Sequence, residues 1–324
     1  MKITSFEEFK ELARRGTFVP VCKEIVADLL TPVSAFLKIA EHADYAFLLE
    51  SVEGGEHVGR YSFLGKDPFL ILRARDGKTT IDRGGQTEIS EQPFIDTLRR
   101  LMADFRSPFV PDLPRFTGGA VGYLGYGAAS WFEPVLGDLG TAADGADAAG
   151  FMLFDTVLAF DHVQHRILII ANARITPDDD LESLYQFACA KIQFLERELE
   201  RNLSHVKHEP AGAPQLQSNY TRERFEEQVR TAKDYIAAGD IYQVVLSQRF
   251  ETEIVADPFT VYRALRHVNP SPYMYFIRMG AVRWSVRRLR CSSASRGRAS
   301  RRIRLLARDG AAGPTRRIYG WPRS

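Results

Sequence analysis

The side chains best suited to chemistry lie in residues 239–250 (GDIYQVVLSQRF). If this stretch is a strand, Gln243, Ser247 and Arg249 share one face, because side chains two residues apart point the same way. The opposite face is then apolar and carries Tyr242, Val244, Leu246 and Phe250. A buried amide, hydroxyl or guanidinium needs hydrogen-bond partners, which a bound polar ligand would supply. A solvated face accounts for the same pattern, so the stretch predicts either a ligand site or a wet surface.

Two helices are predicted to hold this stretch in place. Before it, apolar residues recur at helical spacing from Thr221 to Ala238, with Thr221 as the N-cap and Gly239 as the residue that ends the helix. After it, Asp257 caps a short helix, and a proline-rich turn then leads into a strand at 273–278. The predicted order is therefore helix, strand, helix, strand.

The first 201 residues combine a few helices with many short strands. Helical spacing and capping residues predict helices that start after Ser5 and Thr31 and two more at 94–105 and 181–199. Branched and aromatic runs bounded by Gly, Asp and Pro predict strands at 18–25, 45–51, 61–65, 69–75, 152–160 and 166–171. This order predicts an α+β sheet domain.

Two further patterns have alternative explanations. The glycine-rich run 118–127 lacks a Gly-Lys-Ser/Thr end, so close backbone packing and tight turns explain it better than a phosphate loop. The histidine pairs His162/His165 and His205/His208 lie in connections without a carboxylate at ligand spacing. They favour solvated surface, and we predict no metal site in this chain.

Composition narrows the class of protein. The 324 residues are 45% hydrophobic and 26% charged, as in ordinary globular proteins. The three cysteines Cys22, Cys189 and Cys291 are far apart and form no CxxC pair, which indicates reduced thiols rather than disulfides or zinc. No apolar run approaches the roughly 20 residues of a membrane span, and no signal peptide is evident. We expect a cytoplasmic protein without a membrane partner.

The last 44 residues are a different kind of sequence. Residues 281–324 hold 13 Arg, no Lys or Glu and one Asp, so their net charge is +12, whereas the rest of the chain is −10. Ala, Arg, Gly and Ser make up 29 of these 44 residues, and no periodicity persists for long. We therefore expect an aberrant, Arg-rich and disordered tail.

Several segments together resemble the chorismate-utilising enzyme family, and within it the anthranilate synthase component I type. The strongest match is the run from Ser218 through Phe250. The others are 48–51 (LLES), 59–65 (GRYSFLG), 116–123 (FTGGAVGY) and 269–274 (NPSPYM), in the family's order. The resemblance covers residues 1 to about 280.

The resemblance implies a fold and a division of the chain. It implies an α+β fold with large, mostly antiparallel sheets and flanking helices, incomplete at the C-terminus. The implied parts are an N-terminal region, a linker, the start of the chorismate-binding domain and the tail, at 1–201, 202–217, 218–280 and 281–324.

The resemblance also implies a reaction. Similar enzymes convert chorismate and ammonia into anthranilate and pyruvate with Mg²⁺, as lyases in tryptophan biosynthesis. Their ammonia comes from glutamine through component II, an amidotransferase partner, in a heterotetramer. Gln243 is the implied catalytic residue, where isochorismate-forming relatives carry a water-activating lysine. A neutral amide cannot act as that base, so Gln243 favours the use of ammonia.

Two of the matching segments correspond to the family's tryptophan feedback site. A carboxylate and a hydroxyl suit an amino-acid head group, and a Pro/Tyr/Met wall suits an indole ring. The implied tryptophan-binding residues are Leu49, Glu50, Ser51, Pro272, Tyr273 and Met274. These segments weigh against the similar aminodeoxychorismate synthase component I, which stays as an alternative.

The chain departs from the family after Gly280. The family's downstream segments and the two glutamates that hold Mg²⁺ do not occur, and Asp309 is the single acidic residue that follows. We therefore expect a frame-shifted or prematurely ended product that is catalytically inactive. Two alternatives are a non-catalytic tryptophan-binding module and a tail that binds nucleic acid through its arginines, the second being disfavoured.

Overall fold

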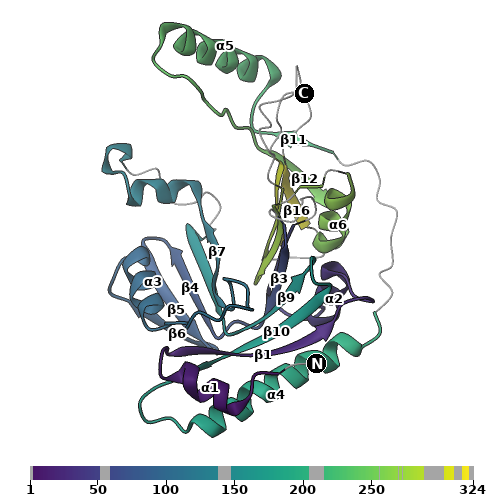
Figure 1. Cartoon of the computed structure of the whole chain (residues 1–324). Helices are drawn as coiled ribbons and strands as arrows, with labels where there is room; N and C mark the ends of the chain where they lie inside the picture. Colours follow the sequence, from purple (N-terminus) through teal and green to yellow (C-terminus); the bar gives the residue numbers. More distant parts are fainter. Residues whose placement is uncertain are drawn as a thin grey trace. The chain divides into compact units, whose positions relative to one another are not determined.

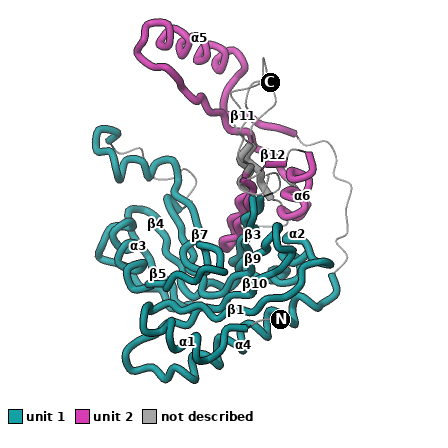
Figure 2. The backbone as a smooth tube through the Cα atoms, in the orientation of Figure 1, with its two compact units in different colours: residues 1–204 teal, residues 205–324 magenta. Residues whose placement is uncertain are grey.

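A computed structural model describes residues 3–51, 59–137, 147–203, 215–254, 256–268, 270–271 and 273–287, and the backbone of strands 303–309 and 316–320. The chain divides into two compact units, residues 1–204 and 205–324 (Figure 2). The division falls within the linker 202–217 that the sequence suggests.

The first unit contains an antiparallel sheet in the order β1-β10-β9-β3-β2. Its strands are β1 (Phe18–Val26), β10 (Arg166–Arg174), β9 (Thr156–Asp161), β3 (Tyr61–Lys66) and β2 (Tyr45–Glu50). In β10, the run from Ile167 to Ala173 is buried at every residue. A strand buried on both faces reads as a continuous apolar run rather than an alternating one.

Three helices accompany this sheet in unit 1 (Figure 1). They are α1 (Phe6–Ala13), α2 (Pro32–Ile39) and α4 (Leu181–Glu200). Ser5 and Glu8 form the predicted capping box of α1, and Thr31 with Pro32 opens α2 as predicted. Helix α4 lies against β10. Helical spacing predicts an inward stripe of Leu184, Ala188, Ile192, Leu195 and Leu199, and all of these but the half-buried Leu184 are buried.

A second antiparallel sheet in unit 1 has the order β6-β5-β4-β8-β7. Its strands are β4 (Leu70–Arg75), β5 (Lys78–Arg83), β6 (Gln86–Ser90), β7 (Gly119–Leu124) and β8 (Ala149–Phe154). Helix α3 (Phe94–Ala103) packs Phe94 and Leu101 into the same core as Leu72 and Leu153. Short 3₁₀ turns, η1 (Tyr126–Trp131) and η2 (Pro134–Leu136), follow β7.

The glycine-rich run serves close packing, as predicted. Gly122 of β7 lies so near the neighbouring strand that a Cβ atom there would sit 2.0 Å from the carbonyl oxygen of Gly150. No larger residue fits at that distance without moving the backbone of β8. This glycine therefore sets the spacing of two strands.

The second unit contains antiparallel strands that are hydrogen-bonded in the order β13-β14-β15-β16-β12-β11. Its strands are β11 (Gln217–Ser218), β12 (Phe250–Ile254), β13 (Met274–Met279), β14 (Val282–Arg287), β15 (Ile303–Asp309) and β16 (Arg316–Gly320). The last three strands lie in the part of the sequence expected to lack regular structure. Their backbone pairing differs from that expectation.

Helices α5 (Arg222–Ala238) and α6 (Pro258–Val268) also belong to the second unit. Helix α5 begins at the predicted N-cap Thr221 and ends at Gly239, whose φ of 83° is the left-handed conformation that glycine tolerates. No residue of α5 is buried. Capping residues and apolar periodicity thus predicted the helix correctly. However, no described residue packs against its apolar face closely enough to bury any of its residues.

The strand predicted from Ile241 onward is wrong over most of its length. Residues 241–249 have no regular secondary structure, and strand β12 begins only at Phe250. Near its end, the Asn219 N–H donates to the carbonyl of Arg249, and the Arg249 N–H donates to Asn219 Oδ1. An alternating sequence makes a strand only where a neighbouring strand accepts its backbone hydrogen bonds, and no described strand pairs with 241–249.

Candidate functional site

Gln243 lies in the irregular segment between α5 and β12. The side chains of Gln243, Ser247 and Arg249 are exposed, and the neighbouring Tyr242 is 95% exposed. The sequence pattern allowed either a buried ligand site or a solvent-exposed surface at these three residues. In the structure their side chains are exposed to solvent. The catalytic role of Gln243 stays a prediction from the resemblance.

The segment Leu49-Glu50-Ser51 lies at the end of β2 in unit 1. Leu49 pairs with Phe63 of β3, which is the last residue pair of the β2–β3 ladder. Glu50 is only 5% exposed. The Oγ atom of Ser51 is buried and has no hydrogen-bond partner among the described residues. An unpaired buried polar atom costs about 1–3 kcal/mol, so this hydroxyl is an unsatisfied group within the described part of the chain.

Ser62 and His162 lie beside this segment. The Ser51 N–H donates to Ser62 Oγ at 3.4 Å, and Ser62 Oγ is 2.8 Å from Nε2 of His162. Ser62 is on β3 and is 1% exposed. His162 directly follows β9, and its N–H donates to the carbonyl oxygen of Arg60 at 2.9 Å. Three segments distant in the sequence thus meet at one hydroxyl group.

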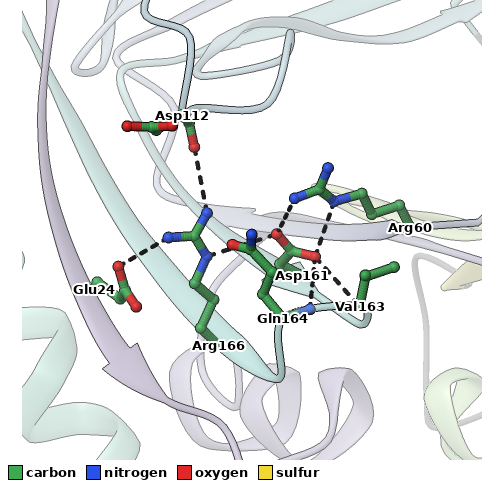
Figure 3. A network of polar contacts seen from close by, with 7 residues as sticks. All are labelled: Glu24, Arg60, Asp112, Asp161, Val163, Gln164 and Arg166. Carbon is green, nitrogen blue, oxygen red and sulfur yellow. Dashed lines mark hydrogen bonds and ion pairs between the residues drawn. The ribbon is translucent and has the colours of Figure 1, made fainter. Parts of the chain in front are cut away.

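Charged side chains hold the turn after β9 (Figure 3). The Asp161 carboxylate accepts two hydrogen bonds from Arg60, from Nε at 3.0 Å and from Nη2 at 2.7 Å. It also accepts from the N–H groups of Val163 and Gln164, both at 3.2 Å. Such a bidentate, charge-assisted pair fixes direction as well as distance. The turn that carries His162 is therefore anchored on both sides.

The same contacts shift the pKa values of Asp161 and Arg60 in opposite directions. Burial acts to raise the pKa of Asp161, but the hydrogen bonds from Arg60, Gln164 and Val163 and the charge of Arg60 outweigh it and lower that pKa. The pKa of Arg60 is raised, chiefly by its hydrogen bond to Asp161. The carboxylate is thus held in its ionised form.

Arg166 extends this network across the sheet. Its Nη1 donates to Glu24 on β1 at 2.9 Å, and its Nη2 donates to the backbone carbonyl of Asp112 at 3.5 Å (Figure 3). Its Nε is 3.6 Å from Asp161 Oδ2. The network therefore ties β1 and β10 to the turn after β9.

The other predicted tryptophan segment belongs to unit 2. Pro272 lies outside the described residues. Tyr273 is 45% exposed, and its N–H donates to Ser271 Oγ at 3.4 Å. Met274 begins β13 and is 1% exposed, so it packs into its own unit. Of the predicted indole wall, Tyr273 is the described side chain that is open to a ligand.

The described residues offer no fit for the implied Mg²⁺. No three His, Cys, Asp or Glu side chains among them gather into a group that would hold a metal ion. His162 instead contacts Ser62, and the pair His205/His208 lies outside the described part.

No helix in the described part of the chain has both the length and the apolar character needed to cross a bilayer. Cys22 and Cys189 are free thiols.

The hydrogen bonds that link His162, Ser62 and the Ser51 backbone could not be predicted from the sequence alone. Sequence reasoning treated His162 only as half of a possible metal pair, and Ser62 only as part of a matching segment. The signal was the position of each residue at a strand end, but their pairing depends on the β3–β9 register, in which Ser62 faces Phe160. The sequence of either strand alone does not determine the register between two strands that are about 100 residues apart in the chain.

The profile described as chorismate binding enzyme matches residues 44–292. The chain belongs to the chorismate-binding enzyme family. It is 43% identical over 286 residues to a protein of Synechocystis sp. named anthranilate synthase component 1, covering 85% of this chain and 56% of that one. It is 39% identical over 290 residues to the Acetivibrio thermocellus protein of the same name, covering 86% of this chain and 57% of that protein.

A solved structure agrees with these matches. The crystal structure of anthranilate synthase component I from Streptococcus pneumoniae has a TM-score of 0.55 and 26% identity, covering 81% of this chain and 56% of that one. The predicted resemblance and the α+β fold with large antiparallel sheets are confirmed. The present chain spans a little over half the length of these relatives.

Proposed function

We propose that this chain is part of an anthranilate synthase component I. The complete enzyme would convert chorismate and ammonia into anthranilate and pyruvate. The observation that supports this most directly is the 43% identity, over 85% of the chain, to the Synechocystis protein of that name. The exposed Gln243, a neutral amide, agrees with the use of ammonia rather than activated water.

The proposal extends to partners and setting. The ammonia would come from glutamine through an amidotransferase, component II, in a heterotetramer, and Mg²⁺ would be held by residues that this chain does not contain. The free thiols of Cys22 and Cys189 fit a reducing, cytoplasmic setting.

Tryptophan is the proposed feedback inhibitor. The support is the sequence neighbours Glu50, which is buried, and Ser51, whose hydroxyl has no partner among the described residues; a carboxylate and a hydroxyl suit the ammonium and carboxylate of an amino acid. Tyr273 belongs to unit 2, and its part in tryptophan binding rests on the resemblance alone. The same observations favour one second candidate, a tryptophan-binding module without catalysis.

A chimaera tests the enzyme proposal. Residues 1–280 are joined to the C-terminal part of the Synechocystis relative, and anthranilate fluorescence is followed with chorismate, ammonium and Mg²⁺. We expect the chimaera to form anthranilate, the Gln243→Ala chimaera to lose most of this activity, and the 324-residue chain to form none. A chimaera that folds, as shown by circular dichroism, but yields no anthranilate would contradict the proposal.

Thermal unfolding of the 324-residue chain with tryptophan tests the second candidate. A ligand that binds only the folded state raises the melting temperature. A shift with tryptophan but not with alanine, in a chain that makes no anthranilate, would support a sensing role.

A further inference from the structure

Ser62 replaces a backbone partner where the β2–β3 ladder ends. The ladder runs from Ala46↔Lys66 to Leu49↔Phe63 and does not include Glu50 or Ser51. Beyond it, the Ser51 N–H donates to the side chain of Ser62 instead of to a strand. The backbone at Ser51 is therefore held by a side-chain hydroxyl, which a single substitution can remove.

His162 decides how that hydroxyl is used. A serine hydroxyl has one proton to donate and two lone pairs with which to accept. With its Nε2 2.8 Å from Ser62 Oγ, the His162 ring can accept a hydrogen bond from the hydroxyl, which leaves the oxygen lone pairs facing the Ser51 N–H. Because Ser62 is 1% exposed, its hydroxyl is shielded from water on the Ser62 side of these bonds.

The histidine is itself fixed through its backbone. Its N–H donates to the Arg60 carbonyl, and the preceding Asp161 carboxylate is held by the Arg60 guanidinium and by two backbone N–H groups. The His162 side chain is nevertheless exposed at the surface. It can be replaced without leaving a cavity in the core, which makes it suitable for a test.

We propose that Ser62 and His162 are positioning residues that aim Ser51 at the head group of a bound amino acid. The chain of contacts runs from the His162 ring through the Ser62 hydroxyl to the Ser51 backbone. It therefore positions the residue whose hydroxyl has no partner among the described residues. The ligand half of this inference rests on the proposed tryptophan site. The positioning half concerns this chain's own hydrogen bonds.

Calorimetric titration of the 324-residue chain with tryptophan tests the ligand half. Loss of one buried hydrogen bond should raise the Kd about tenfold in Ser62→Ala and in His162→Leu. His162→Gln, whose amide can replace Nε2 in the bond to Ser62, should stay within about threefold of the wild type. His165→Asn, which changes the other exposed histidine of the same turn, should leave the Kd unchanged.

Amide hydrogen exchange at Ser51, measured without ligand, tests the positioning half. Exchange should be faster in Ser62→Ala and His162→Leu but not in His162→Gln or His165→Asn. Equal exchange in all variants would overturn the positioning role. A lowered melting temperature with an unchanged Kd would reduce Ser62 and His162 to structural residues.

Failure of the proposed function gives a different result. If the wild-type chain shows no heat of binding with tryptophan, both the proposed tryptophan site and the proposal that Ser62 and His162 position Ser51 for a ligand are contradicted. The exchange rates still decide the positioning half.

Discussion

At the scale of single residues, the Asp161–Arg60 pair is a bidentate, charge-assisted contact near the candidate site. The Asp161 side chain is fully buried and accepts four hydrogen bonds, two from Arg60 and two from backbone N–H groups. Asp161→Asn removes the charge that these donors face. We expect the free energy of unfolding to fall by about 1–3 kcal/mol, measured by urea denaturation. Asp44→Asn, at an exposed position, is the control and should change it by less than about 0.5 kcal/mol.

The effect of Asp161 should depend on pH in a defined direction. Because folding lowers its pKa, the carboxylate stabilises the fold above its unfolded value of about 3.9, and this contribution is lost as the pH falls through the folded value. The difference in unfolding free energy between wild type and Asp161→Asn should therefore be constant above about pH 5 and narrow as the pH falls from about 5 to about 3. A difference that stays constant across this range would show that the charge is not the cause.

At the scale of elements, helix α4 is held to the first sheet by its buried stripe. Ile192 is fully buried, whereas Gln193 on the next position is exposed. Ile192→Ala should lower the unfolding free energy by about 2–4 kcal/mol through lost burial and a residual cavity. Gln193→Ala should change it by less than about 0.5 kcal/mol. Equal effects in urea denaturation would mean that α4 contributes little to the stability of the unit.

The elements also show what sequence reasoning can and cannot reach. Helices α1, α2, α4 and α5 were predictable because capping residues and apolar spacing act within the helix itself. The strand predicted from Ile241 failed because a strand depends on a neighbour that its own residues do not specify.

The residues of the candidate site also divide into those that the sequence could predict and those that depend on strand pairing. Glu50, Ser51 and Gln243 came from contiguous motifs. The contact between Ser62 and His162 came only from the register of two strands.

At the scale of the whole molecule, the two units differ in how much apolar surface they cover. Unit 1 buries the continuous strand β10 and the stripe of α4. In unit 2, α5 buries no residue, and Tyr242 and Val245 of the following segment are 95% and 64% exposed. Segments with few buried apolar contacts open at low free-energy cost, so unit 2 should be the first to be cleaved by a protease.

Limited trypsin digestion of the 324-residue chain measures this difference directly. Helix α5 offers Arg222, Arg224, Arg230 and Lys233 to the enzyme. We expect these bonds to be cut early and an N-terminal fragment ending near Arg201, at the end of α4, to persist. The Ile192→Ala variant is the matched control, because loosening α4 should shorten the lifetime of that fragment without changing the early cuts. Persistence of α5 while unit 1 is degraded would show that the exposed face of α5 is covered in solution, and would place the stable core of the chain in unit 2.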